Sequence, residues 1–386
     1  MANLTADSVP NSALQSIDEA ALLIICLRDL PFLVPGDTDW QALLSLATAH
    51  GVLLLVYQSF LERNIEIPTF FAAAVQEQRD VAEMYAAELE SLLKIFAEHG
   101  IETLPLKGPV LAEALYGDVT QRSYNDLDLL VRRDEFARAE ILLLDMGFIA
   151  LAGDETYHST FIRLGVVVEL HFGVGSPPFF PSGFFQFDVD GVWSRTTRGT
   201  FRGLPIRVMS EDDLVLFLCL HGFQHGFSRL IWIKDIARAL GAMRCRSAEE
   251  LAQNARRQKL ELALLIGCEI VRETLQQLPQ EMDVLAAESR EVNERVRHAV
   301  RLLFAEDTGT NANREVELWS FYLQTEQSLR RRWSHRLGFL APTASDFAWA
   351  ERHGINRGLM IILRPFRLLQ KYGMSSAWRV LFPREV

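Results

Sequence analysis

The stretch YNDLDLLV at positions 124–131 places two carboxylates, Asp126 and Asp128, in an otherwise apolar run. A short apolar run after polar turn residues predicts a buried strand. Alternate side chains of a strand share a face, so the two acids would project together while Leu127 and Leu129 face the core. Like charges raise each other's pKa, and a divalent cation is the usual compensation. For this stretch alone, a strand end with two solvated acids is an equally good interpretation.

The segment upstream reads as a short strand at residues 101–106, a turn at Lys107-Gly108, and a helix from Pro109 to Tyr116. Proline suits the first turn of a helix because its fixed φ is already helical. Backbone amides at Gly108 and at the helix start could hold phosphate oxygens, and Lys107 could add a point charge. Taken alone, the same residues are simply a strand-to-helix turn.

Downstream, the β-branched run VVVELHF at residues 166–172 is interrupted by Glu169. An acid within this apolar run is explained if its strand lies beside the Asp-x-Asp strand, so that Glu169 supplies a third carboxylate. His171 has the same parity as Glu169 and would face the same way. Asp126, Asp128 and Glu169 on adjacent strands can hold two Mg²⁺ ions that clamp the attacking and leaving oxygens of a phosphoryl displacement, with Mn²⁺ as the alternative ion.

Several motifs together resemble a known family. They are Leu106-Lys107-Gly108, Tyr116, Arg122, DLDLLV at 126–131, ELH at 169–171, HGFQH at 221–225, LIWIKDIA at 230–237 and, weakly, LRP at 363–365. They resemble the bacterial uncharacterised nucleotidyltransferase family of the polymerase-β superfamily, over most of the chain from about residue 75 onward. The superfamily carries Gly-Ser or Gly-Gly before its acids, whereas this chain carries Gly108-Pro109 and a longer spacer.

This resemblance implies a Mg²⁺-dependent enzyme that transfers an NMP from an NTP to an acceptor and releases pyrophosphate. It implies that Asp126, Asp128 and Glu169 are the catalytic, metal-binding residues, with Glu169 alternatively acting as the base. The residues implied to bind the nucleotide are Lys107, Gly108, Arg122, His171, His225 and Trp232. Because the serine is missing, Lys107 or Arg122 would take over its role at the terminal phosphates.

The histidines and the tryptophan of the later motifs each allow two interpretations. His221 and His225 are four residues apart, as zinc ligands on one helix face are, but Gly222 stands where a metalloprotease carries its glutamate base. The pair is therefore structural or, as the resemblance implies, lines a nucleotide or acceptor pocket. Trp232 is most simply a core residue, and base stacking is the alternative.

Composition narrows the class of protein. Of the 386 residues, 49% are hydrophobic and 23% charged, which is ordinary for a globular protein with a large core. No apolar run reaches the roughly 20 residues that span a bilayer. The cysteines Cys26, Cys219, Cys245 and Cys268 lie far apart and lack zinc-ligand spacing, so we expect reduced thiols and a cytoplasmic location.

The net charge of −11 is unevenly distributed: from residue 330 onward, eleven Lys and Arg face three acids, so this region carries +8 and the remainder −19. The acidic body argues against a general nucleic-acid binder. The basic region, with its interleaved aromatic residues, could contact RNA, anionic lipid or an acidic partner. Amphipathic helices packed on the acidic body are the simpler interpretation of this region.

These patterns predict an α+β fold with a polymerase-β-like core of a small mixed sheet and helices, embedded between helical regions. The expected divisions are a disordered 1–17, a helical 18–100, the catalytic core 101–209, a helical 210–329 and the basic helical 330–386. Further strands are expected at 157–164 and 204–209, a helix at 134–146, and an N-cap at Ser210. The acceptor would be a small molecule, peptide or protein held between the strand core and the helices after Ser210.

Two other functions fit the same acids. A glycosyltransferase can hold a metal and a sugar nucleotide with Asp-x-Asp, but that fold places its motif after alternating strands and helices, and here about a hundred helical residues come first. A catalytically degenerate domain that serves as a binding or scaffold module is the non-enzyme alternative. The retained acids beside Lys107-Gly108 argue against decay, whereas Gly108-Pro109 leaves room for it.

Overall fold

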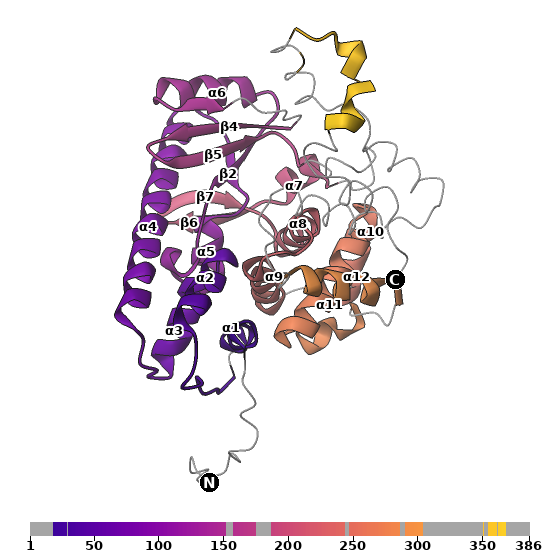
Figure 1. The fold of residues 1–386 in the computed structure, drawn as a ribbon. Helices are drawn as coiled ribbons and strands as arrows, with labels where there is room; N and C mark the ends of the chain where they lie inside the picture. Colours follow the sequence, from indigo (N-terminus) through magenta and orange to yellow (C-terminus); the bar gives the residue numbers. More distant parts are fainter. Residues whose placement is uncertain are drawn as a thin grey trace.

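The computed structural model describes residues 18–28, 30–151, 157–174, 187–243, 247–285, 290–303, 350, 354–360 and 362–367. In these residues a small mixed sheet is combined with a larger number of helices, which confirms the predicted α+β class (Figure 1). The expected disordered segment 1–17 and most of the basic region 330–386 lie outside the described residues.

The described chain begins with helices. These are α1 (Glu19–Leu27), α2 (Trp40–Ala49), α3 (Leu53–Glu62) and α4 (Thr69–Glu98). The helix α4 begins directly after Pro68 and is 30 residues long. Its first half, with Phe71 and Val75, packs with α1–α3, and its second half, through Phe96, packs on the sheet. One helix therefore joins the N-terminal helices to the sheet.

The sheet has the strand order β1-β2-β5-β4-β3. Its strands are β1 (Thr103–Pro105), β2 (Leu127–Val131), β3 (Ile149–Leu151), β4 (His158–Arg163) and β5 (Val166–His171). Between β1 and β2 lie α5 (Pro109–Tyr116) and the short η1 (Val119–Gln121), and α6 (Phe136–Asp145) follows β2. The strands β2 and β5 run parallel, and the other neighbours are antiparallel. The predicted strands of this core are confirmed, and β3 was not foreseen.

The two faces of the sheet pack against different cores. Leu127, Leu129 and Val131 of β2 join α4 and α6 in one apolar cluster, as the strand period predicts. Leu130, on the opposite face, belongs to the larger cluster formed by the remaining helices. Asp128 has the parity of Leu130, so its carboxylate lies on the face of the sheet that is turned toward the later helices.

The second half of the chain is mainly helical. It contains α7 (Val189–Arg195), the hairpin β6 (Thr197–Phe201) and β7 (Leu204–Val208), α8 (Glu211–Gln224), α9 (Leu230–Ala242), α10 (Ala248–Arg257), α11 (Glu261–Leu275), η2 (Gln280–Leu285), α12 (Arg290–Leu303) and η3 (Arg357–Leu359). The predicted cap at Ser210 is present, because its side chain accepts a hydrogen bond from the Asp213 amide at 3.3 Å. The strand β6 was not foreseen.

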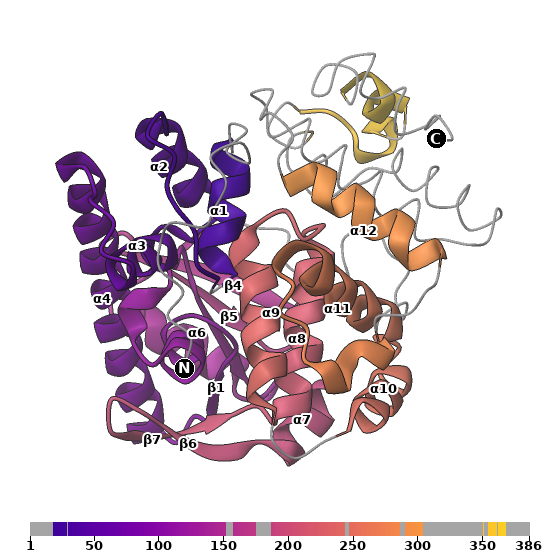
Figure 2. The same cartoon turned by 90° about the horizontal axis from the view of Figure 1, so that it is seen from below.

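The N-terminal and later helices share one core, although a long stretch of sequence separates them (Figure 2). Lys234 of α9 donates to the carbonyl of Leu27 at the end of α1 at 2.7 Å. Arg28 donates to the carbonyl of Thr274 in α11 at 2.9 Å. These bonds satisfy carbonyls that a helix end leaves open and fix α1 on the later helices.

Cys26, Cys219 and Cys268 are buried free thiols, as expected, and Cys245 lies outside the described residues. Burial raises the pKa of Cys26 and of Cys268 to about 12 each. Among the described helices, none combines the length and the apolar character that a membrane crossing requires. The cytoplasmic location stays a prediction.

The hairpin of β4 and β5 turns through only two residues, Leu164 and Gly165, with φ of +48° and +86°. Positive φ at both positions is typical of the turn that matches the twist of an antiparallel pair. Glycine adopts it freely, whereas leucine does so at a cost of about 1–2 kcal/mol. The Leu164 side chain is 92% exposed, so it gains no burial in return.

Replacing Leu164 with asparagine should therefore stabilise the protein by up to about 1 kcal/mol, because asparagine tolerates this backbone conformation and little burial is lost. Chemical denaturation measures the free energy of unfolding. Leu164→Ala is the control, since it removes the same exposed side chain but keeps the unfavourable backbone. Equal stabilities of the two variants would contradict the strain at this turn.

Candidate active site

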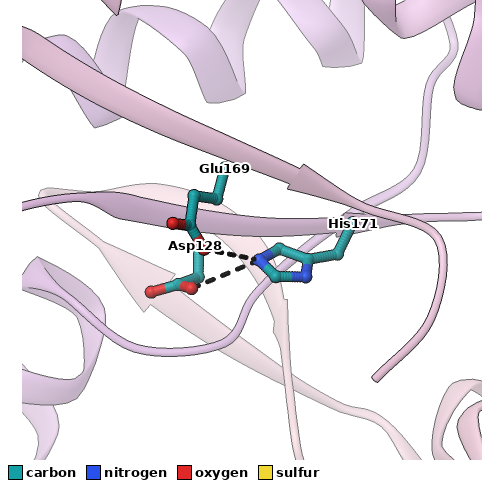
Figure 3. Close-up of side chains that lie close together, drawn as sticks. All are labelled: Asp128, Glu169 and His171. Atoms are coloured by element: carbon teal, nitrogen blue, oxygen red, sulfur yellow. Dashed lines mark hydrogen bonds and ion pairs between the residues drawn. The ribbon is translucent and has the colours of Figure 1, made fainter. Parts of the chain in front are cut away.

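Parallel pairing of β2 with β5 brings the acidic residues together. Asp128 is the register partner of Glu169, and His171 follows two residues later on the same face. His171 Nε2 lies 3.2 Å from Asp128 Oδ1 and 3.5 Å from Glu169 Oε2, and the three side chains converge on one point (Figure 3). One ligand atom from each residue lies within 4.8 Å of the others, a spacing that could hold a metal ion.

Lys107 adds a cation to this group. Its Nζ lies 3.0 Å from Asp128 Oδ2, and the side chains are only 11% and 4% exposed. Burial alone would raise the pKa of Asp128, but the charges of Lys107 and His171 outweigh it and hold this pKa well below its usual range. Burial opposes the charge on His171, yet the two carboxylates raise its pKa to about 9. The site is thus a compact arrangement of compensating buried charges.

Gly108 gives Lys107 its position. It is the N-cap residue of α5, with φ of +72° and ψ of −142°, a conformation that only glycine adopts without strain. The chain therefore reverses directly after Lys107, and Pro109 opens the helix as the sequence predicted. Gly108 and the first residue of α5 directly follow Lys107 in the chain, and Lys107 is paired with Asp128.

Asp126 is the residue directly before β2, and it is outside the group of three ligand residues that the described part of the chain forms. Its role beside Asp128 as a metal ligand stays a prediction. Burial raises the pKa of Asp126, and the negative charge of Asp128 raises it further, so the two acids still act on each other.

Arg122 has a different partner from the one expected. Its guanidinium contacts the Asp235 carboxylate of α9 at 2.9 and 3.0 Å, and Tyr116 donates to the same carboxylate at 2.7 Å. Arg122 and Asp235 are buried and Tyr116 is half-buried, and the carboxylate raises the pKa of Arg122 against the effect of burial. This buried pair ties the loop before β2 to α9. A direct contact of Arg122 with phosphate stays a prediction, and this geometry gives it no support.

His221, His225 and Trp232 form one aromatic cluster at the junction of α8 and α9. The His221 ring centroid lies 4.7 Å from that of His225 and 5.2 Å from that of Trp232, and the latter two are 5.1 Å apart. Trp232 is half-buried against the helical core, and His225 is exposed. Burial lowers the pKa of His221, and the charge of Lys107 lowers it further, so this cluster lies within electrostatic reach of the acidic site.

Residues 36–276, which include every side chain of this site, match the family described as "Uncharacterised nucleotidyltransferase". The chain belongs to this nucleotidyltransferase family. The resemblance inferred from the Lys-Gly, Asp-x-Asp and Glu-x-His motifs is thereby confirmed. No curated protein matches the chain.

Solved structures of nucleotidyltransferases and a tRNA-processing enzyme show a weak likeness. The antibiotic-resistance factor ANT(2'')-Ia is 13% identical, with 47% of this chain and 90% of that chain covered and a TM-score of 0.31. An antigenic nucleotidyltransferase-like protein from Paracoccidioides brasiliensis is 22% identical over 55% of this chain and 93% of its own, with a TM-score of 0.33. The tRNA-processing enzyme, in an apo form, is 13% identical over 83% and 94%, with a TM-score of 0.24.

Sequence reasoning missed His158. It is the register partner of His171 across β4 and β5, and the two rings stack with centroids 4.9 Å apart. His158 Nε2 lies 4.0 Å from Glu169 Oε2. The signal was available, because a two-residue turn at Leu164-Gly165 fixes the register of the hairpin and sets His158 opposite His171.

We expect Arg122→Met to lower the free energy of unfolding by about 3–5 kcal/mol, because it leaves the buried Asp235 carboxylate without its counter-charge. The double variant Arg122→Met/Asp235→Leu should recover most of this loss, since it removes the unpaired charge as well. Denaturant titration of both variants measures the effect. If Arg122→Met is as stable as the double variant, the Asp235 carboxylate does not depend on Arg122 as its counter-charge.

Proposed function

We propose that the protein is a metal-dependent nucleotidyltransferase that transfers an NMP from an NTP to an acceptor with release of pyrophosphate. The observation that carries this proposal is the register of β2 and β5, which sets Asp128 beside Glu169 in a chain of a nucleotidyltransferase family. Lys107 and the Gly108 turn stand next to these acids, where an anionic substrate would find a cation and backbone amides.

The residues present fit the divalent ions that such chemistry uses. Two carboxylates and an imidazole within 4.8 Å are metal donors, and Asp126 precedes Asp128 in the same chain segment. Asp126, Asp128 and Glu169 would hold two Mg²⁺ or Mn²⁺ ions. When bound, the ions would neutralise phosphate charge and align the attacking and leaving oxygens.

The chain's own groups would bind, orient and accept a proton. The ammonium of Lys107 and the amides around Gly108 would hold the triphosphate, which fixes the α-phosphorus near the acids. An acceptor oxygen then forms a bond to this phosphorus while the bond to the pyrophosphate oxygen breaks. Glu169, whose side chain is 30% exposed, is the carboxylate open enough to take the acceptor proton if it acts as base.

The aromatic cluster would supply the second side of the substrate site. His225 is exposed, Trp232 is half-buried, and the Arg229 guanidinium lies 5.8 Å from the Trp232 ring centroid. Flat rings beside a cation can stack a nucleobase or an aromatic part of an acceptor. The acidic body favours a small molecule, peptide or protein over a long polyanion as acceptor.

Calorimetric titration with ATP, CTP, GTP and UTP, each with and without Mg²⁺, is the direct experiment. Metal-dependent binding of at least one NTP supports the proposal. Pyrophosphate release in the presence of acceptor pools then separates it from a glycosyltransferase, which would release a nucleotide from a sugar nucleotide instead. Metal-independent binding, or none at all, would favour the binding or scaffold module.

Asp126→Asn and Asp128→Asn should each lower NTP turnover by at least about a hundredfold while the fold is retained, because each removes a charge that the ions and phosphates require. Pyrophosphate release measures turnover, and circular dichroism checks the fold. Asp134→Asn is the control, since Asp134 is an exposed acid shortly after the same strand. Normal turnover in either site variant would overturn the assignment.

His225→Ala and Trp232→Ala should raise the KM for nucleotide or acceptor by about tenfold, as expected for the loss of one stacked ring, and change thermal stability little. Steady-state kinetics and thermal melting are measured on the same preparations. Phe70→Ala, which removes an exposed ring on α4, is the matched control. If the two variants melt early while the folded fraction keeps normal kinetics, the rings are structural and the acceptor lies elsewhere.

A further inference from the structure

The tight ligand group of this site contains a nitrogen. Among the described residues, the three side chains close enough to hold one ion are Asp128, Glu169 and His171. His171 Nε2 lies between the carboxylates, 3.2 Å from Asp128 Oδ1 and 3.5 Å from Glu169 Oε2. Two ligands at about 2.1 Å from one ion are about 3.0 Å apart at a right angle and about 3.4 Å apart at the tetrahedral angle. The nitrogen is thus at ligand spacing from both acids.

The surrounding side chains fix the position of the His171 ring, as a metal ligand requires. It is buried on β5, opposite His158 in the sheet register, and the two rings stack at an interplanar angle of 24°. Its other nitrogen, Nδ1, is buried and has no hydrogen-bond partner. No bond on that side decides which nitrogen carries the proton of the neutral ring. Nε2 can therefore offer an N–H to the carboxylates or a lone pair to an ion.

We propose that His171 Nε2 binds the divalent ion directly, together with Asp128 and Glu169, and that this nitrogen gives the site a preference for a transition-metal ion such as Mn²⁺ over Mg²⁺. Mg²⁺ is a hard ion that demands oxygen ligands in near-ideal octahedral geometry. Imidazole suits the transition metals better, so a mixed nitrogen and oxygen set shifts the relative affinities toward them. This inference rests on the proposed function only in requiring that a divalent ion binds.

The alternative role of His171 is a hydrogen bond to Asp128, with oxygen atoms alone on the ion. The two roles differ in whether the nitrogen touches the metal, and Mn²⁺ reports this directly. Pulsed electron paramagnetic resonance of the full-length protein loaded with Mn²⁺ should show the ¹⁴N hyperfine coupling of a coordinated imidazole. The coupling should be lost in His171→Gln and retained in His99→Gln, which removes an exposed histidine at the end of α4, outside this site.

A competition titration measures the preference. His171→Gln should weaken Mn²⁺ binding by at least about tenfold, the lower end of what even an indirect partner of a metal ligand contributes, and should weaken Mg²⁺ binding by less. The His99→Gln variant should keep the wild-type ratio of the two affinities. An unchanged ratio in His171→Gln would overturn the inference.

The wild-type protein alone keeps the inference testable if His171→Gln fails to fold. Labelling its histidines with ¹⁵N should replace the ¹⁴N coupling with the ¹⁵N one. Bound Mn²⁺ without a directly coordinated nitrogen overturns this inference and leaves the proposed function standing. Absence of any divalent-ion binding contradicts the proposed function itself.

Discussion

The parallel pairing of β2 with β5 is the interaction on which the rest of the site depends. It sets Asp128 and Glu169 side by side, and two carboxylates in that position repel each other and resist burial. The surrounding structure compensates with cations: Lys107 approaches from the turn after β1, and His171 approaches from β5 itself. The turn at Gly108 positions Lys107, and the register of β2 with β5 positions His171 beside the acids.

A second buried charge pair orients the helices relative to this sheet. Arg122 stands shortly before β2, and Asp235 lies on α9, so their contact joins the loop that leads into the acidic strand to the helix that carries Trp232. Tyr116, at the end of α5, donates to the same carboxylate. Removing one partner of such a pair leaves an uncompensated buried charge. The resulting loss of stability is far larger than the stability that the pair adds over apolar residues at the same positions. Once formed, the pair therefore resists separation and fixes the geometry around it. The aromatic cluster and the acids thus keep a fixed relation.

Properties that depend on one strand or one turn could be predicted from the sequence. The parity of Glu169 and His171 on their strand, the turn at Lys107-Gly108 and the start of α5 at Pro109 follow from local periods and backbone preferences. The first residue of β2 could not be read in this way, because where a strand begins depends on tertiary pairing. The contact of Arg122 with Asp235 could not be predicted for a related reason: the two residues are more than a hundred positions apart, and no local pattern marks their pairing.

The departure from the Gly-Ser or Gly-Gly pattern changes which backbone donors the turn after β1 can offer. Pro109 has no amide hydrogen, so the first turn of α5 offers one donor fewer to an anion. Lys107 stands immediately before this turn, and its charge is paired with that of Asp128. In the proposed reaction, a triphosphate and a divalent ion would arrive together, the phosphates as a new partner for Lys107 and the ion as a new partner for Asp128. The exchange would leave neither buried charge uncompensated, which is the condition under which such a pair can open at low cost.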